Sequence, residues 1–355
     1  MTGRPRILFL ADAGPAVGGG HVMRCLTLAQ ALRRAGAECA FVAASAVAGV
    51  LDVFADEGIG RLNLADAPLA ALVPRTALAA KAWRADAVVV DHYGVNRSME
   101  AMLESRVLVV MDDLRRGHDA TLVLDSNLGR GPEDYPGIEA LLGPRFALVR
   151  PEFGNFREAA LLRRADTAGP ARLLIALGLT DVGGITARVL AALAGDLGGW
   201  QVDVVVGAAA PSLAALTAQA KRDPRIALHI DTRQMAALTA RADLAIGAGG
   251  SSTWERCCLG LPTITVVLAD NQRDNAVALG EEGASLVVFP LPTEEVFQDQ
   301  LRAAFLRLGA DAALRAEMSR AAAALCDGRG ADRVAERVMA LVSSAPGPTP
   351  AARRA

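Results

Sequence analysis

Residues 6–35, RILFLADAGPAVGGGHVMRCLTLAQALRRA, contain the unit from which the whole chain is built. The apolar run Arg6–Leu10 has the length of a strand, and a glycine-rich loop follows it. Val22–Ala35 then carries apolar residues at helical spacing and ends before Gly36, a common helix terminator. Strand, glycine loop and helix in this order predict the first half of a parallel βαβ unit.

The same alternation continues along the chain with one interruption. Residues 142–166 have a different texture, prolines followed by a charged run, and we expect a linker there. The sequence therefore predicts an α/β fold of two doubly wound, Rossmann-like domains with a cleft between them. We expect an N-terminal domain at 1–165, a C-terminal domain at 166–342 and a disordered tail at 343–355. The further expected strands are 39–43, 87–90, 107–110, 121–124, 172–176, 203–206, 226–229, 244–246 and 263–267, and the further helices are 185–194, 236–242, 301–323 and 332–342.

The composition fits two closely packed cores. Of 355 residues, 52% are apolar and only 4% aromatic, which favours helix–sheet packing over an all-β barrel. The formal net charge is −2 without a long basic tract, so we expect no nucleic-acid partner. No apolar run reaches the roughly 20 residues of a membrane span, and no signal peptide is recognisable. The five cysteines form no CxxC pair, which favours a reducing cytoplasm.

The loop before the first helix is the first candidate site. Its three consecutive glycines let backbone N–H groups approach a ligand, and the helix start adds a positive end. His21 lies at that start, where the positive end favours a neutral imidazole able to act as a base. A solvent-exposed histidine after a glycine turn is the alternative. Arg24 lies on the same helix face and binds phosphate or pairs with Asp12. The expected ligand contacts here are Gly19, Gly20, His21 and Arg24.

Residues 244–256, LAIGAGGSSTWER, predict a second strand, glycine turn and helix. Gly247, Gly249 and Gly250 open the turn. Two serines follow, which can cap the helix and donate to phosphate oxygens, and a glutamate one turn later can accept both hydroxyls of a ribose. A capped helix without a ligand, followed by a solvated polar loop at 268–275, is the alternative. The expected contacts are Gly249, Gly250, Ser251, Ser252, Glu255 and Gln272.

These two loops are similar to those of the UDP-sugar hydrolases of pseudaminic acid biosynthesis, which are relatives of the MurG-type glycosyltransferases. The stretches that carry the resemblance are GGGHVMRCLTLAQAL, VVVDHYGV at 88–95, VMDDLRRGHDATLVLDSN at 110–127, LLGPRFALVRPEF at 141–153 and GAGGSSTWERCCLGLPTITVVLADNQ. The resemblance extends to about residue 280 and implies the GT-B fold, with UDP held mainly by the C-terminal domain. It implies a bacterial enzyme that hydrolyses a UDP-linked 2,4-diacetamido-2,4,6-trideoxy-L-altrose with inversion, for surface or flagellin glycosylation. No metal and no organic cofactor are implied.

The resemblance also implies roles for individual residues. His21 is the expected catalytic base, and Tyr93 and Asn271 line the sugar and water site. Three departures from the family pattern stand near these loops. Leu10 and Gly14 replace polar residues expected close to the cleft, and Leu179 replaces a glycine expected to approach phosphate.

Other interpretations stay open at this point. A GT-B glycosyltransferase would use the same UDP site but needs an acceptor groove, and residues 45–80 show no apolar or basic patch for one. A non-catalytic protein that binds a nucleotide sugar is the third reading. The oligomeric state is open, a monomer included. The remaining histidines have no metal-ligand spacing, and we expect His92, His118 and His229 to be structural or solvated.

Overall fold

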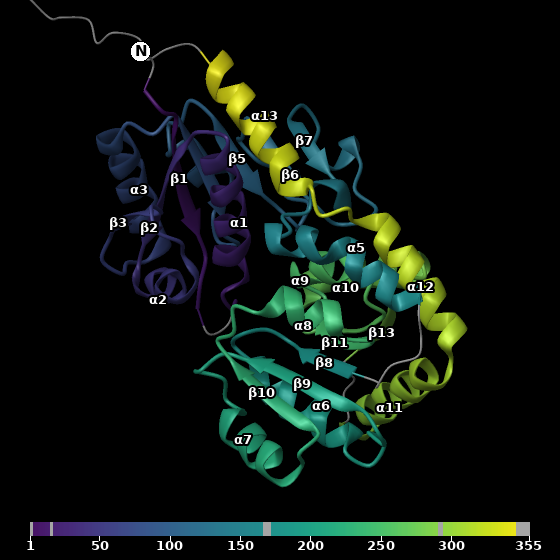
Figure 1. The fold of residues 1–355 in the computed structure, drawn as a ribbon. Coiled ribbons are helices and arrows are strands. Elements are labelled where there is room, and N and C mark those ends of the chain that lie inside the picture. The colour runs from purple at the N-terminus through teal and green to yellow at the C-terminus, as the bar shows by residue number, and fades with distance from the viewer. Residues whose placement is uncertain (1–2, 15–16, 166–171, 290–293, 346–355) are drawn as a thin grey trace, which may run out of the picture.

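The computed structural model describes residues 3–14, 17–165, 172–289 and 294–345. They form two parallel sheets, one above the other in Figure 1, each packed with helices. The first sheet has the strand order β3-β2-β1-β4-β5-β6-β7 and the second the order β10-β9-β8-β11-β12-β13. The strands are β1 (Arg6–Ala11), β2 (Glu38–Ala43), β3 (Gly60–Asn63), β4 (Ala87–Asp91), β5 (Leu108–Met111), β6 (Leu122–Asp125), β7 (Glu139–Leu142), β8 (Arg172–Ala176), β9 (Gln201–Val206), β10 (Ile226–Ile230), β11 (Leu244–Ala248), β12 (Thr263–Val266) and β13 (Leu286–Val288).

Every strand expected from the sequence is present. Most are apolar runs that a parallel sheet buries on both faces, whereas the edge strand β10 is partly exposed. In β1, Ile7 and Phe9 enter one apolar core while Leu8 and Leu10 enter the core on the opposite face. Leu10 therefore points into packed side chains and not toward the cleft, which corrects the expectation for that position. The strands β3, β7 and β13 were not predicted, and each has only three or four residues.

The structure adds helices at 45–54, 69–83, 97–101, 213–222 and 273–281 to those named from the sequence. The predicted helices are present, with two differences. The predicted stretch 301–323 is two helices, because Asp311 interrupts it and accepts a capping hydrogen bond from the backbone N–H of Leu314. The predicted linker contains a full helix from Pro151 onward. The helices are α1 (Gly20–Arg34), α2 (Ser45–Phe54), α3 (Leu69–Trp83), α4 (Arg97–Ala101), α5 (Pro151–Ala165), α6 (Ile185–Leu193), α7 (Leu213–Arg222), α8 (Met235–Arg241), α9 (Ser252–Cys258), α10 (Arg273–Glu281), α11 (Glu294–Ala310), α12 (Ala312–Leu325) and α13 (Gly330–Ser344).

Two helices cross between the domains. Helix α5 packs with α8, α9 and α12 and places Phe153 in a core of the second domain, although the sequence boundary at 165 assigned it to the first. Helix α13 runs back along the first domain (Figure 1) and packs Val334 and Val338 into its core against α1, although the boundary at 342 assigned it to the second. The predicted tail from residue 346 lies outside the described residues, and Ser343 and Ser344 belong to α13.

Each sheet reverses its strand order at one point, between β1 and β4 in the first and between β8 and β11 in the second. Loops that leave the carboxyl ends of the strands on either side of such a point diverge and leave a crevice, where ligands of this fold class bind. The four loops concerned start at Asp12, His92, Leu177 and Gly249. Together with the segment after β12, which contains Asn271 and Gln272, they bring together the residues that the sequence analysis selected.

Candidate functional site

A cavity of about 470 Å³ lies between the two domains and is lined by the loops of both reversal points. All the predicted site residues lie on its wall. They are Gly19, Gly20, His21, Arg24 and Tyr93 from the first domain and Gly249, Gly250, Ser251, Ser252, Glu255, Asn271 and Gln272 from the second. The structure thus collects into one cavity residues that are up to 253 positions apart, between Gly19 and Gln272.

His21 and Arg24 share one buried carboxylate. Nδ1 of His21 lies 2.6 Å from Oδ1 of Asp91, the last residue of β4. Arg24 donates to both oxygens of Asp91, at 2.5 and 2.6 Å. Burial alone would raise the pKa of Asp91, but the guanidinium of Arg24 and the imidazole of His21 hold it well below its ordinary value. Asp91 is therefore an anion beneath the cavity floor.

This arrangement decides two alternatives left open by the sequence. His21 is 5% exposed, so it is not a solvated histidine after a turn. Arg24 pairs with Asp91, and its third nitrogen lies 3.7 Å from Asp113, so Asp12 is not its partner. Arg24 also lines the cavity, and its contact with a phosphate stays a prediction. Because an ionised carboxylate only accepts hydrogen bonds, the short contact to Asp91 assigns the proton of the neutral imidazole to Nδ1. The lone pair is then on Nε2, the nitrogen that a general base uses in a histidine–aspartate pair.

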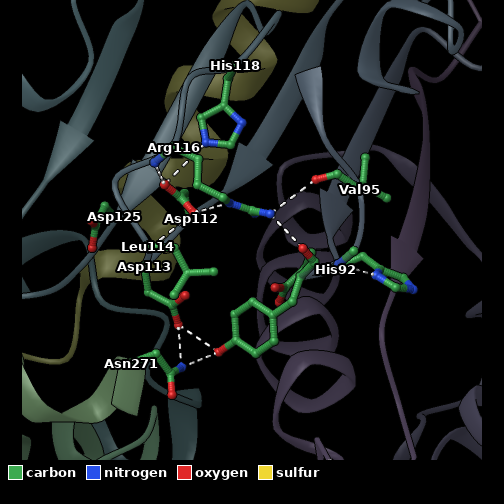
Figure 2. Close-up of polar contacts among 12 residues, drawn as sticks. His92, Val95, Asp112, Asp113, Leu114, Arg116, His118, Asp125 and Asn271 are labelled. Carbon is green, nitrogen blue, oxygen red and sulfur yellow. Dashed lines mark hydrogen bonds and ion pairs between the residues drawn. The ribbon is translucent and has the colours of Figure 1, made fainter. Parts of the chain in front are cut away.

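A chain of hydrogen bonds crosses the cavity from the second domain to the first. Nδ2 of Asn271 lies 2.6 Å from the hydroxyl of Tyr93, which in turn donates to Oδ2 of Asp113 at 2.9 Å. Figure 2 shows Asn271 reaching toward Asp113. The ring of Tyr93 stands edge-on to His21, with centroids 4.4 Å apart. Burial, together with the charge of Asp113, raises the pKa of Tyr93 far above its ordinary value, so its hydroxyl keeps its proton.

The loop of Tyr93 is held from behind by a buried polar network. One nitrogen of Arg116 donates to the backbone carbonyls of Tyr93 and Val95, at 2.6 and 3.2 Å, and the guanidinium also contacts Asp112 (Figure 2). His118 lies beyond, between Asp112 and Glu100, with Nδ1 2.7 Å from Glu100 and Nε2 3.2 Å from Asp112.

His118 differs from its sequence interpretation. It is 3% exposed, whereas the sequence indicated a solvated loop. Burial alone would lower its pKa, but the carboxylates of Asp112 and Glu100 raise the pKa of His118 to about 9. The sequence contains no signal for this, because Glu100 and Asp112 lie on α4 and after β5 and meet His118 only in the fold.

The glycine turn of the second domain follows β11. Ser251 makes no capping hydrogen bond with its side chain, and the hydroxyl of Ser252 accepts one from Arg256, so the predicted capping role is wrong for both. The carboxylate of Glu255 is held by the guanidinium fork of Arg150, at 2.6 and 3.0 Å. Any ribose that binds Glu255 therefore shares the carboxylate with Arg150 or displaces it.

Three residues of this site were not found from the sequence as ligand contacts. Asp113 and Arg150 line the cavity, and Asp91 lies beneath it. All three belong to the quoted stretches DHYG, VMDD and LVRPEF, which is the one signal that pointed to them. Their partners are 67, 158 and 105 residues away, in Arg24, Asn271 and Glu255, so spacing along the chain carried no further information.

Two departures from the family pattern, Leu179 and Gly14, remain to be placed, and only the first of them lines the cavity in the described structure. Leu179 lines the cavity, and its backbone carbonyl accepts a hydrogen bond from the N–H of Gly207 at 3.0 Å. Gly14 pairs with Gly18 through two backbone hydrogen bonds that close the first loop, and it is absent from the described lining of the cavity. Gly18 has φ +78°, a conformation that favours glycine.

Other expectations concern metals, membranes and thiols. Among residues 3–14, 17–165, 172–289 and 294–345, no cluster of three or more His, Cys, Asp or Glu side chains is placed to hold a metal ion. In the same part of the chain no helix has the length and apolarity to cross a membrane. All five cysteines are buried and form no disulfide.

The chain is similar to a glycosyltransferase domain, a polysaccharide biosynthesis protein and a nucleotide-sugar hydrolase. Residues 217–336 match the glycosyltransferase family 28 C-terminal domain. The spore coat polysaccharide biosynthesis protein SpsG of Bacillus subtilis is 29% identical over 54% of this chain, and the match spans 56% of SpsG, little more than half its length. The UDP-2,4-diacetamido-2,4,6-trideoxy-beta-L-altropyranose hydrolase of Campylobacter jejuni is 23% identical over 78% of this chain and 97% of that protein.

Among solved structures, MurG of Acinetobacter baumannii is similar across the whole fold. It superposes with a TM-score of 0.63 at 18% identity, over 95% of this chain and 99% of MurG. The predicted fold class is confirmed: the chain has the GT-B arrangement of two parallel-sheet, Rossmann-like domains.

Proposed function

We propose that the chain hydrolyses UDP-2,4-diacetamido-2,4,6-trideoxy-β-L-altropyranose to UDP and the free sugar, with inversion at the anomeric carbon. The observation that carries the proposal is the His21–Asp91 pair, which offers a base in the cavity that also contains the glycine turn of the second domain. The Campylobacter hydrolase, matched over 97% of its length, supports the same reaction. A nucleotide sugar as substrate makes the cytoplasm the expected location.

In this mechanism His21 Nε2 takes a proton from a water molecule, whose oxygen attacks the anomeric carbon as the bond to the UDP oxygen breaks. General-base help of this kind accelerates a reaction by about 10²–10⁴-fold. Asp91 orients the imidazole and stabilises the imidazolium that forms. No step requires a metal ion, so UDP release is expected to be unchanged by EDTA.

Asn271 holds the water with its amide oxygen. The amide nitrogen is already committed to Tyr93 and Asp113, which fixes the orientation of the side chain. Its Oδ1 makes no protein hydrogen bond within the part of the chain that the structure describes, and it remains as the acceptor for water. The hydroxyls of Ser251 and Ser252 donate to the departing diphosphate.

A glycosyltransferase is the second candidate, because a basic groove adjoins the cavity. The groove, of about 560 Å³, shares Met23, Thr27, Phe54 and Arg150 with the cavity. Its charged lining consists of Arg33, Arg34, Arg150, Arg233, Asp56 and Glu152. Arg34 pairs with Asp332 and Arg150 with Glu255, so Arg33 and Arg233 are the arginines available to an anionic acceptor. The search of residues 45–80 missed it because the arginines come from α1 and from other parts of the chain. The family 28 match favours the same reaction.

The test is UDP release from the UDP-linked diacetamido altrose, with UDP-N-acetylglucosamine as the control. Rapid release from the first substrate alone, without an acceptor, is the expected result. Tight UDP binding without release would contradict hydrolysis. UDP release that begins only when an anionic hydroxyl acceptor is added would then support the transferase. No UDP release under any condition would support a protein that binds nucleotide sugars without turnover.

A further inference from the structure

Arg256 is buried directly behind the glycine turn of the second domain. It is 4% exposed, and its guanidinium donates to the carbonyl of Ala248 at 2.7 Å and to the hydroxyls of Thr253 and Ser252 at 3.1 Å. All three acceptors are neutral, and Nε has no partner within the described residues. The adjacent carboxylate of Glu255 is held by Arg150. The positive charge of Arg256 is therefore not paired with an acidic side chain in the described part of the chain.

Other buried arginines of the protein are compensated. Arg24 pairs with Asp91, and Arg130 pairs with Asp125. Arg164 has no carboxylate bond, but it donates to five backbone carbonyls, those of Ala160, Thr239, Ala240, Ala242 and Leu259. Several of these lie at or just beyond helix C-termini, which carry partial negative charge. Arg256 contacts one carbonyl, so it differs from each of them.

The second domain makes room for this cation with a glycine. A Cβ on Gly247, within β11, would lie 2.5 Å from one terminal nitrogen of Arg256. The backbone of Gly247 is not among the positive-φ glycines, so its conformation is open to other residues. Gly247 is thus required by the guanidinium beside it and does not open the turn, which corrects the sequence interpretation.

We infer that Arg256 is a positioning residue for the diphosphate of a nucleotide held at Gly249–Ser252. The guanidinium donates to the Ser252 hydroxyl oxygen, which leaves the hydroxyl proton free to point at a phosphate oxygen in the cavity. Its buried charge lies where an anionic ligand supplies the missing counter-charge. This inference rests on the proposed function for the identity of the anion.

The test compares the affinities of UDP and uridine in wild-type protein and in Arg256→Gln. UDP carries the diphosphate and uridine lacks it, so their ratio isolates its recognition. We expect UDP to bind about ten- to hundredfold more weakly in the variant, and uridine to change by less than about threefold. Arg164→Gln is the matched control, since it removes another guanidinium that has no carboxylate bond and lies away from the cavity. It is expected to lower the melting temperature and keep the ratio.

Gly247→Ala provides a second, independent variant if Arg256→Gln does not fold. The new methyl group displaces the guanidinium while its charge stays in the chain, and the UDP-to-uridine ratio is again expected to fall. Equal losses for UDP and uridine would overturn the inference, because Arg256 would then only stabilise the turn. A wild-type protein with no preference for UDP over uridine would also overturn it. A normal preference for UDP over uridine in a wild-type protein that does not hydrolyse the substrate would contradict the proposed function and leave this inference standing.

Discussion

Both domains contain an aspartate that binds a histidine and an arginine at the sheet, and the clusters at Asp91 and Asp203 differ in their place along the strand. In the first domain Asp91 binds His21 and Arg24. In the second domain Asp203 binds His229 at 2.7 Å and Arg241 at 2.6 Å. The residue types and the hydrogen-bond lengths are nearly the same, so neither distinguishes a site from a structural contact.

The position along the strand separates the two clusters. Asp91 is the last residue of β4, beside a reversal of strand order, and His21 lies in the first turn of α1. Asp203 lies inside β9, and His229 lies on the neighbouring edge strand β10. Only the first cluster reaches the cavity in the described structure.

The Asp91 cluster is also more deeply buried than the Asp203 cluster. The Asp91 side chain is fully buried and that of Arg24 is 16% exposed, whereas that of Arg241 is 45% exposed. Water screens the second cluster and leaves the first in a low-dielectric surrounding, where a carboxylate orients an imidazole more strongly. The comparison teaches that the residue trio does not by itself make a site, and that its place beside a reversal of strand order and its access to the cavity do.

The largest expected effect comes from replacing the two histidines. His21→Leu is expected to lower UDP release by about 10²–10⁴-fold and to leave the dissociation constant of UDP within about twofold, because it removes the base and no phosphate contact. His229→Leu, the matched control, is expected to keep normal turnover. Single-turnover UDP release and UDP titration measure both quantities. Normal turnover in His21→Leu would remove His21 from the mechanism.

The next effect concerns the two carboxylates. Asp91→Asn is expected to reduce the free energy of unfolding by about 3 kcal/mol, because Arg24 stays buried without its main partner. Turnover per folded molecule should fall as well, since the imidazole loses its acceptor. Asp203→Asn should cost less stability, because Arg241 regains water, and should leave turnover unchanged. Urea unfolding followed by circular dichroism checks the first part, and equal losses in the two variants would contradict it.

His118 is buried between two carboxylates and does not line the cavity in the described structure. We therefore expect its replacement to change stability and not turnover. The pKa of His118 is raised to about 9 from about 6.5 in an unfolded chain. Its stabilising contribution is therefore complete below about pH 6.5 and is lost as the pH rises through 9. His118→Gln is expected to reduce the free energy of unfolding by about 2 kcal/mol at pH 6 and by much less at pH 10. Denaturation at both pH values measures this, and a loss independent of pH would refute it.

The smallest effect concerns Glu255, whose carboxylate is expected to bind the ribose and to take no part in proton transfer. Glu255→Gln should lower the affinity for UDP by about tenfold, because a charged hydrogen bond to the ribose is lost. It should also reduce the preference for UDP over 2′-deoxy-UDP, while turnover at saturating substrate changes little. Titration with both nucleotides measures the preference. An unchanged preference would show that Arg150 keeps Glu255 occupied and that ribose binds elsewhere.

The sequence by itself determined the elements that local pattern controls. Apolar runs such as Arg6–Leu10 became buried strands, and glycine loops became the starts of helices α1 and α9. Because loops at the carboxyl ends of parallel strands share one edge of a sheet, the residues chosen from those loops reached the same cavity. The alternation of strands and helices was therefore enough to find the region of the site.

Only the tertiary structure decided which groups pair and which core each helix joins. An amphipathic helix specifies its apolar face but not the surface that face meets, so α5 and α13 changed domains relative to the sequence boundaries. Charges find partners through space, and Asp91 with His21, Asp113 with Asn271 and Arg150 with Glu255 are separated by 70 to 158 residues. Pairing across such distances depends on strand order and domain packing, which no short stretch of sequence contains.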